Sequence, residues 1–313
     1  MSPQQKLPIA SARALAQTIA DAVAEAVLGK SDQIRLAVAC LLARGHLLIE
    51  DVPGVGKTTL AHALADACGL AWRRMQFTSD LLPADLLGVS VWESANSRFA
   101  FRAGPIFTEV LLADEINRAS PKTQSALLEA MEERRVSIEG ETHPLPDPFF
   151  VIATQNPAHH AGTFDLPESQ LDRFLMRLTL GYPPAEAELA LLSGRDRRTR
   201  STIKCVADRA TLTALQASCS EVYVSDAIAR YVLRLLSATR SHAHIQLGLS
   251  PRAGLALLAA ARAYSLTEGR DFVAPEDVQA VWSPVAAHRL HSADGRGAAA
   301  TLVDEILLAT PVA

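Results

Sequence analysis

A glycine-rich segment between two regular elements constrains this chain more than any other feature. It reads D-V-P-G-V-G-K-T-T over residues 51–59, after the apolar run His46–Ile49 and before the helix-forming run Lys57–Cys68. Strand, glycine-rich loop and helix in this order form a phosphate-binding loop, in which backbone N–H groups and a helix N-terminus face an anion. One position departs from the pattern G-x-x-x-x-G-K-[ST], because Asp51 stands where the first glycine is expected.

The loop predicts contacts to a nucleoside triphosphate and its metal ion. The Lys57 ammonium would reach the β- and γ-phosphates, and the Thr58 hydroxyl would bind Mg²⁺. The predicted ATP-binding residues of the loop are Pro53, Gly54, Val55, Gly56, Lys57, Thr58 and Thr59.

Polar side chains follow two further apolar runs. Val110–Ala113 ends in Asp114 and Glu115, about fifty residues after the loop. We expect Asp114 to bind nucleotide and hold Mg²⁺, and Glu115 to polarise the attacking water, so that the pair supports hydrolysis as well as binding. The run Phe149–Ala153 leads to Asn156, a neutral amide placed to orient that water.

The remaining pattern predicts an α/β fold followed by helices. The apolar runs Trp72–Phe77 and Phe174–Leu180 complete a mostly parallel sheet covered on both faces. Val89–Arg102 and Arg135–His143 read as hairpins that the sheet does not need, around residues 95–97 and Gly140. Helical periodicity before the loop covers Ala12–Val27 and Gln33–Ala43.

The composition changes after Pro183. Ala- and Leu-rich helical runs then continue to the C-terminus, at Ala185–Leu192, Thr211–Ser220, Asp226–Arg240, Arg252–Leu266, Pro275–His288 and Ala298–Leu308. We therefore predict a nucleotide-binding α/β domain over residues 1–182 and a small all-helical domain over residues 183–313.

Composition and charge narrow the function classes. With 49% hydrophobic residues the chain can bury a sizeable core, which excludes disorder. The 30 Lys and Arg residues against 34 Asp and Glu give a net charge of -4, which argues against a nucleic-acid partner. The basic run Arg195–Arg200 fits a solvated surface first, a subunit or client contact next, and a nucleic-acid contact third. The N-terminus lacks a signal-peptide pattern and no apolar run reaches the ~18–20 residues of a membrane span, so we expect a cytoplasmic protein.

Several motifs in a fixed order identify a family resemblance. They are G-H-L-L-I-E-D-V-P-G-V-G-K-T-T-L-A, R-M-Q-F-T-S-D-L-L-P-A-D-L-L-G, G-P-I-F-T-E-V-L-L-A-D-E-I-N-R-A, A-T-Q-N-P, G-T-F-D-L-P-E-S-Q-L-D-R-F and L-G-L-S-P-R-A. Together the sequence resembles an AAA+ ATPase, and within that class it is similar to the MoxR family. The resemblance implies an AAA+ P-loop NTPase core, a parallel sheet between helices with two hairpin inserts, and a small all-helical lid. In that family Asp51 is an ordinary variation of the loop.

The resemblance also implies roles that spacing alone does not give. Asn156 takes the sensor 1 position and Arg252 the catalytic and ATP-binding sensor 2 position on the lid. Arg173 takes the position of the arginine finger that is offered to a neighbouring subunit's nucleotide. Leu28 and Gly29 resemble the place where this class binds the adenine base.

The expected activity is Mg²⁺-dependent ATP hydrolysis by a homo-oligomeric ring, expected to be a hexamer. Resemblance to the family implies a chaperone-like role in maturing protein complexes, including metal cofactor insertion, with a protein client and a partner carrying a von Willebrand factor A (VWA) domain. One alternative is a nucleic-acid remodeller of the clamp-loader or helicase-loader kind, which the net charge of -4 disfavours. Another is an ATP-switched scaffold that hydrolyses slowly, which the full set of catalytic residues disfavours.

Overall fold

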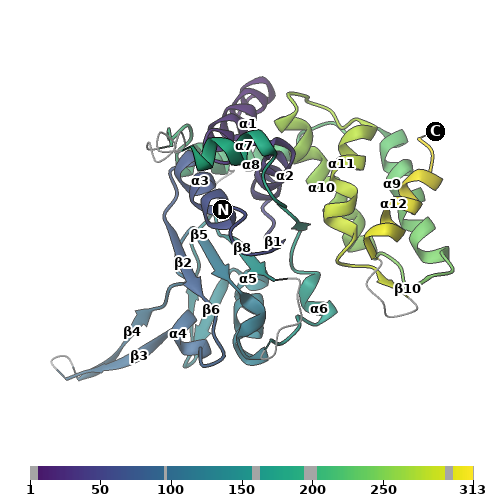
Figure 1. Ribbon diagram of the computed structural model, residues 1–313. Helices are drawn as coiled ribbons and strands as arrows, with labels where there is room; N and C mark the ends of the chain where they lie inside the picture. The colour runs from purple at the N-terminus through teal and green to yellow at the C-terminus, as the bar shows by residue number, and fades with distance from the viewer. Residues whose placement is uncertain (1–5, 95–96, 157–162, 194–202, 293–298, 313) are drawn as a thin grey trace.

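Five parallel strands form the central sheet, in the order β2-β5-β8-β1-β9 (Figure 1). The computed structural model describes residues 6–94, 97–156, 163–193, 203–292 and 299–312. The strands are β1 (Leu47–Glu50), β2 (Trp72–Gln76), β5 (Val110–Asp114), β8 (Phe150–Gln155) and β9 (Met176–Leu178). Because β1 lies between β8 and β9, the loop that follows it opens beside the carboxyl ends of β8 and β5.

The five apolar runs predicted as strands all form strands, with ends that differ by a few residues. The largest difference is at β9, where the apolar run Phe174–Leu180 was predicted as a strand and only Met176–Leu178 is one. Phe174, Leu175 and Leu180 are buried although they lie outside the strand. The apolar run therefore indicates buried residues rather than the length of the strand, because residues in the loops on either side of β9 are buried too.

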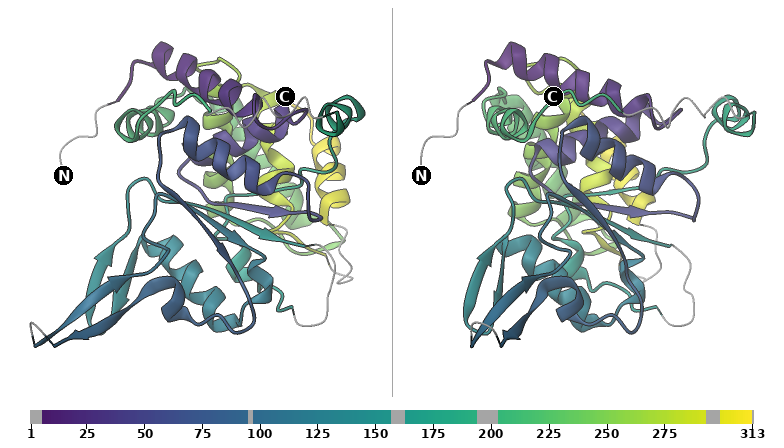
Figure 2. Two further views of the ribbon diagram at one scale, coloured as in Figure 1. Left: turned by 60° about the vertical axis from the view of Figure 1, so that its left-hand side comes forward. Right: turned by 90° about the vertical axis from the view of Figure 1, so that its left-hand side faces the viewer.

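Helices cover both faces of the sheet. On one side lie α1 (Ile9–Ala24), α2 (Ser31–Leu42) and α3 (Lys57–Ala67), and on the other α4 (Pro83–Leu87) and α5 (Pro121–Glu133) (Figures 1 and 2). Alternate strand residues serve the two faces: Leu47 and Ile49 of β1 belong to the first apolar cluster, whereas Leu48 belongs to the second. A sheet buried on both faces explains why its strands read as continuous apolar runs.

The C-terminal half is a group of helices joined to the same core. Its helices are α7 (Ala185–Leu192), α8 (Arg209–Cys219), α9 (Asp226–Ser241), α10 (Pro251–Thr267), α11 (Pro275–Ala286) and α12 (Ala299–Ala309). Three of them, α8, α9 and α10, have N-cap residues whose side chains accept a hydrogen bond from the backbone N–H three residues later. These N-cap residues are Asp208, Ser225 and Ser250.

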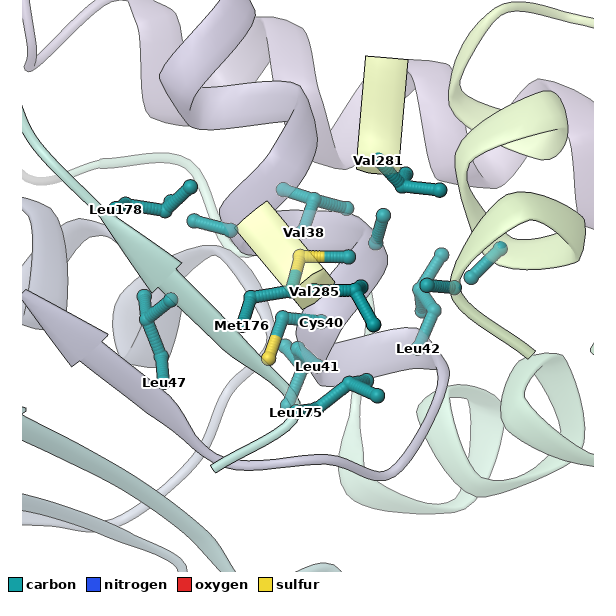
Figure 3. Packing of buried hydrophobic residues seen from close by; sticks show 14 of the residues in the cluster. Val38, Cys40, Leu41, Leu42, Leu47, Leu175, Met176, Leu178, Val281 and Val285 are labelled. Atoms are coloured by element: carbon teal, nitrogen blue, oxygen red, sulfur yellow. The ribbon is translucent and has the colours of Figure 1, made fainter. Parts of the chain in front are cut away.

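The apolar core continues across the position where we predicted a domain boundary. α10 packs against α2 as well as α11, and α1 contacts α8 and α10. Figure 3 shows Cys40 of α2 beside Met176 of β9, with Val285 of α11 close by. The division near residue 182 stays a prediction, because both regions contribute to one cluster of buried side chains.

One pair of strands interrupts the region that was predicted to be all helical. β10 (Ile245–Leu247) and β11 (His291–Ser292) form a two-stranded antiparallel sheet. Strands of three and two residues are too short to show a period of two, so hydrophobic periodicity had no signal to detect.

The two predicted hairpins are present on the α5 side of the molecule. The first joins β3 (Gly88–Glu93) and β4 (Arg98–Ala103), and it projects far from the sheet (Figure 1). The second joins β6 (Arg135–Ile138) and β7 (Glu141–Pro144). The two hairpins touch, because the Phe101 ring stacks on His143 with centroids 3.9 Å apart. Residues 95–96 of the first turn lie outside the described residues.

Two short helical elements remain: the 3₁₀ helix η1 (Ile116–Arg118), between β5 and α5, and the helix α6 (Glu168–Leu171), between β8 and β9. The basic run Arg195–Arg200 falls outside the part of the chain that the structure describes. Among the described helices, none combines the length and apolar character that a membrane crossing requires.

Candidate functional site

A cavity of about 370 Å³ opens at the carboxyl edge of the sheet. Its walls come from the loop after β1 and from the ends of β2, β5 and β8, and they consist of Pro53, Gly54, Gly56, Lys57, Thr58, Thr59, Arg74, Gln76, Asp114, Glu115 and Asn156. The volume lies in the ~300–1,000 Å³ range of ligand sites. The structure thus brings together predicted residues from three separate strands, while the roles of these residues stay predictions.

The loop backbone explains why glycine occupies two of its positions. Gly54 and Gly56 have φ angles of +87° and +97°, in the left-handed region that favours glycine. An added side chain at either position would meet open space. The requirement is therefore conformational: these dihedral angles turn the backbone toward the cavity and start α3 directly after Gly56.

Lys57 lies in the first turn of α3. Its Nζ donates a hydrogen bond to the backbone oxygen of Asp51 over 2.7 Å. Partial burial lowers the pKa of Lys57 below its usual value, and the carboxylates of Asp114, Asp51 and Glu115 oppose this shift. A positive group that is partly desolvated and held at the cavity wall suits the binding of phosphate oxygens.

The Asp114 carboxylate is bound on both oxygens. Oδ1 accepts a hydrogen bond from Thr154 Oγ1 over 2.5 Å. Oδ2 accepts from Arg74, with 2.6 Å to Nη2 and 3.1 Å to Nε. The Thr154 hydroxyl also accepts a hydrogen bond from the backbone N–H of Glu115 over 2.9 Å. One buried threonine therefore positions both the Asp114 carboxylate and the backbone of Glu115.

Glu115 has a backbone conformation that is rare for a side chain of its size. Its φ of +56° lies in the left-handed region, a strain that clusters at functional sites. Its Oε2 accepts hydrogen bonds from Gln76 Nε2 over 2.9 Å and Arg118 Nη1 over 3.1 Å. Asn156 follows β8 and lines the same cavity. A carboxylate and an amide at one cavity wall are the groups needed to align and polarise a water.

The predicted metal ligands fit a Mg²⁺ ion by their chemistry. Thr58 and Asp114 line the same cavity and supply hydroxyl and carboxylate oxygens. Mg²⁺ takes one or two protein oxygens in triphosphate sites and fills its remaining positions with water and phosphate. Arg74 is bound to Oδ2 of Asp114, so this carboxylate already has a cationic partner.

The two predicted arginines lie together on one carboxylate, and neither is among the residues described as lining the cavity. Arg173 Nε is 3.1 Å from Oε2 of Glu132, in the last turn of α5, and Arg252 Nη2 is 3.4 Å from Oε1 of the same carboxylate. Arg252 also approaches Asp172, which is bound by the buried Arg289. We call Arg173, Arg252 and Glu132 the arginine cluster. Its arginines are not among the described residues of the cavity wall.

Leu28 and Gly29 lie beside the link between β9 and α7. Gly29 has a φ of +71°, and an added Cβ would come within 2.6 Å of the Pro184 Cδ atom. Glycine is therefore required both by conformation and by contact. These two residues are likewise absent from the described wall of the cavity, so their place beside the adenine stays a prediction.

The sequence did not reveal four of the residues that shape these sites: Arg74, Gln76, Thr154 and Glu132. Arg74 and Gln76 are exposed on the edge strand β2, where the other residues are exposed or half-buried, so they resemble the polar side chains of any edge strand. Thr154 belongs to an apolar run, and Glu132 reads as an exposed helix residue. A signal existed for the β2 pair, because neighbouring parallel strands end at the same edge as Asp114.

Comparison with known proteins agrees with this architecture. The family model of the ATPase family associated with various cellular activities (AAA) matches residues 46–176, and that of the AAA lid domain matches residues 237–306. Chaperone MoxR1 of Mycobacterium tuberculosis is 40% identical over 304 residues, which cover 92% of this chain and 80% of the relative. The chain therefore belongs to the MoxR family of AAA+ ATPases.

Other relatives extend the comparison. An uncharacterised Bacillus subtilis protein, YeaC, is 48% identical over 84% of this chain and 83% of its own length. Protein MoxR of Paracoccus denitrificans is 35% identical over 84% of this chain and 85% of its own. The crystal structure of a candidate ATPase from Cytophaga hutchinsonii superposes with a TM-score of 0.86 at 33% identity, covering 97% of this chain and 96% of that one.

Proposed function

We propose that this protein hydrolyses ATP in a Mg²⁺-dependent reaction at the cavity beside the P-loop. The observation that carries the proposal is the convergence of Lys57, Thr58, Asp114, Glu115 and Asn156 on one cavity. These residues come from three strand ends and supply a phosphate-binding cation, metal-binding oxygens and groups that act on water. Membership of an AAA+ family supports the same activity.

Each of the predicted site residues has a role in this proposal. The loop N–H groups and Lys57 bind the phosphates, and Thr58 and Asp114 would hold Mg²⁺, which neutralises charge on the transferring phosphoryl group. Glu115 draws the proton of the attacking water, with Asn156 orienting that water. Leu28 and Gly29 are assigned to the base. The hydrogen bonds from Gln76 and Arg118 to Oε2 hold the Glu115 carboxylate at the cavity wall for this task.

A second subunit completes the site in this proposal. Arg173 and Arg252 share Glu132, and neither is among the residues described as lining the cavity of their own chain. We assign both to a neighbouring subunit's nucleotide, where a guanidinium stabilises charge that develops on the phosphoryl group. A homo-oligomeric ring, expected to be a hexamer, would supply such neighbours around its circumference.

The ring would perform chaperone-like work on a protein client. Relatives named as a chaperone and as MoxR proteins support this role. The finer expectations, a VWA-domain partner and a part in metal cofactor insertion, come from the family resemblance. Isolation of complexes on a Glu115→Gln variant that retains ATP would test them, since the partner and client should stay bound.

Two substitutions test the proposed activity. Lys57→Ala removes the ammonium from the cavity and should weaken ATP binding in calorimetry by tenfold or more, given a charge-assisted bond worth roughly 1.5–3 kcal/mol. Glu115→Gln should retain ATP binding and lose roughly 10²–10⁴-fold in phosphate release. Glu129→Gln, an exposed change on α5, is the matched control. Unchanged ATP affinity in Lys57→Ala, or full turnover in Glu115→Gln, would contradict the assignment.

A further inference from the structure

Asp51, the residue that departs from the loop motif, has a buried carboxylate bound on both oxygens. Oδ1 accepts the Val52 N–H over 2.8 Å, and Oδ2 accepts the Gly181 N–H over 2.6 Å. Only 5% of Asp51 is exposed. Gly181 belongs to the link between β9 and α7, so the bond joins the start of the P-loop to that link. A glycine at position 51 would provide neither hydrogen bond.

Lys30 holds the same link from a second side. Its Nζ donates hydrogen bonds to the backbone oxygens of Leu180, over 2.6 Å, and Tyr182, over 2.5 Å. Lys30 is also buried, with 8% exposed. The N–H of Gly181 thus meets an anion while the carbonyls on either side of it meet a cation. We call Lys30, Asp51 and the segment Leu180–Tyr182 the linker clamp.

The clamp touches both ends of the predicted nucleotide site. Lys30 directly follows Gly29, which is assigned to the base and lies against Pro184 of the link. The backbone oxygen of Asp51 accepts the Lys57 ammonium, which is assigned to the phosphates. A movement of Gly29 at the base end, or of Lys57 at the phosphate end, therefore acts directly on a residue of the clamp.

Burying the charges of Lys30 and Asp51 costs free energy, although a β-turn or a proline could hold the link in place without that cost. Each ion loses its hydration and must recover the cost through hydrogen bonds. Among the described residues, those bonds go to backbone groups of the link and the loop. The arrangement makes the position of the link depend on the position of the loop, because the link makes charge-assisted hydrogen bonds to Asp51 and Lys30.

We propose that Asp51 and Lys30 are positioning residues that transmit occupation of the P-loop to α7 through the linker clamp. This inference rests on the proposed function, in which Lys57 binds the phosphates; to do so, the ammonium leaves the backbone oxygen of Asp51. The Asp51 backbone then loses its cationic donor and shifts, and Gly181 follows because its N–H is bound to the same residue. Occupied and empty sites thereby differ in where the link holds α7.

α7 is suited to move in response. Leu189 and Leu192 are 66% and 81% exposed, and α7 stands clear of the other helices in the right-hand view of Figure 2. Few buried contacts resist its displacement. The clamp at its N-terminal end is therefore the principal restraint described for this helix.

Hydrogen exchange of the full-length protein with and without a non-hydrolysable ATP analogue and Mg²⁺ tests the proposal. A peptide over residues 178–184 reports on the amides of Leu180, Gly181 and Tyr182, because its first two residues keep no label and Pro183 and Pro184 carry no N–H. A peptide from the first turns of α3 reports on occupation of the loop. In the wild-type protein we expect the analogue to change exchange at both places, by roughly threefold or more at the clamp.

Two variants should separate the two responses. Asp51→Asn is nearly isosteric, but its amide NH₂ group faces one of the two backbone N–H donors that Asp51 binds. Lys30→Met removes the cation that binds the Leu180 and Tyr182 carbonyls. At saturating analogue, α3 should still respond in both variants while the change at residues 180–184 disappears. Without nucleotide, exchange of the Gly181 amide in Asp51→Asn should rise roughly tenfold, as expected for loss of a charged acceptor.

Glu50→Gln is the matched control. Glu50 immediately precedes Asp51, and its Oε2 accepts a hydrogen bond from Arg177 of β9 over 3.0 Å, so the same change removes a charge without touching the link. It should keep both responses. Two results would overturn the clamp: a wild-type α3 that responds while residues 180–184 do not, or clamp variants that retain the wild-type response. No response at either place in the wild-type protein would remove the proposed nucleotide site and the coupling with it.

Discussion

The cavity beside the P-loop and the arginine cluster differ in how their charges are arranged. In the cavity, Arg74 pairs directly with Asp114, whereas the Lys57 ammonium is bound to the backbone oxygen of Asp51, and these groups line an open space of about 370 Å³. In the arginine cluster, Glu132 bridges Arg173 and Arg252 directly, and no described cavity-lining residue belongs to it. The first region has the groups that bind a triphosphate, and the second has guanidinium groups without a phosphate site of their own.

The difference teaches how work is divided between subunits in the proposed ring. A chain that carries its binding groups and its charge-stabilising arginines in separate places can bind ATP alone and needs a second copy to hydrolyse it at full rate. Substitutions in the two regions should therefore affect different measurements. Those in the cavity change binding or chemistry in every subunit, and those in the cluster change turnover only.

The largest effect that separates the regions is expected for Arg173→Ala. A guanidinium supplied in trans contributes roughly 10³–10⁵ to the rate of phosphoryl transfer, so turnover should fall by about 10³-fold or more. ATP affinity should stay within about twofold, because Arg173 does not line the cavity of its own chain. Phosphate release and calorimetry measure the two quantities.

Arg135→Ala is the control for that change. Arg135 is an exposed arginine whose described ion pair is with Glu133, at the end of α5. It should retain turnover. A loss of ATP affinity in Arg173→Ala comparable to its loss of turnover would break the separation between the two regions.

An intermediate effect is expected inside the cavity for Thr154→Val. The change keeps the shape of the side chain but leaves Asp114 Oδ1 and the Glu115 N–H without their shared partner. Displaced catalytic groups should reduce turnover by roughly 10²-fold. Unfolding in denaturant should show a loss of about 1–3 kcal/mol, since the Asp114 oxygen is buried and the Glu115 N–H is partly buried.

Thr213→Val provides a matched comparison, because its hydroxyl bonds only to a backbone oxygen one turn earlier in α8. It should change stability and turnover little. If Thr154→Val lowers stability and leaves turnover intact, the threonine supports the fold without positioning the catalytic carboxylates.

The smallest effect is expected for Glu132→Gln in the arginine cluster. The carboxylate is partly exposed, and ion pairs of this kind contribute about 0.2–1 kcal/mol. Turnover should therefore change by roughly two- to fivefold through loss of arginine alignment, with ATP affinity unchanged. Glu133→Gln, the neighbouring residue that pairs with Arg135, is the control. A change in affinity for Glu132→Gln would place the cluster nearer its own cavity than we propose.

The parts of the molecule that the sequence predicts well are those with a local signal. The P-loop, the strands before Asp114 and Asn156, and the two hairpins are each specified by neighbouring residues, through glycine positions, apolar runs and turns. The parallel sheet followed from their order. β10 and β11 left no comparable signal because each spans no more than three residues.

Contacts that need the tertiary structure could not be predicted in the same way. Thr154 meets Asp114 because β8 pairs with β5, and Arg74 meets it because β2 pairs with β5. The bond from Gly181 to Asp51 joins residues 130 positions apart. Motif position suggested roles for Arg173 and Arg252, but only the structure shows that one carboxylate holds both.

The central claim is that one active site combines the cavity of one subunit with the arginine cluster of another. The most direct test mixes two inactive variants, Arg173→Ala, which keeps Glu115, and Glu115→Gln, which keeps Arg173. We predict that phosphate release recovers on mixing to well above either variant alone, because some interfaces then pair an intact cavity with an intact arginine. Absence of any recovery, in mixtures that light scattering shows to contain oligomers of both chains, would contradict the claim.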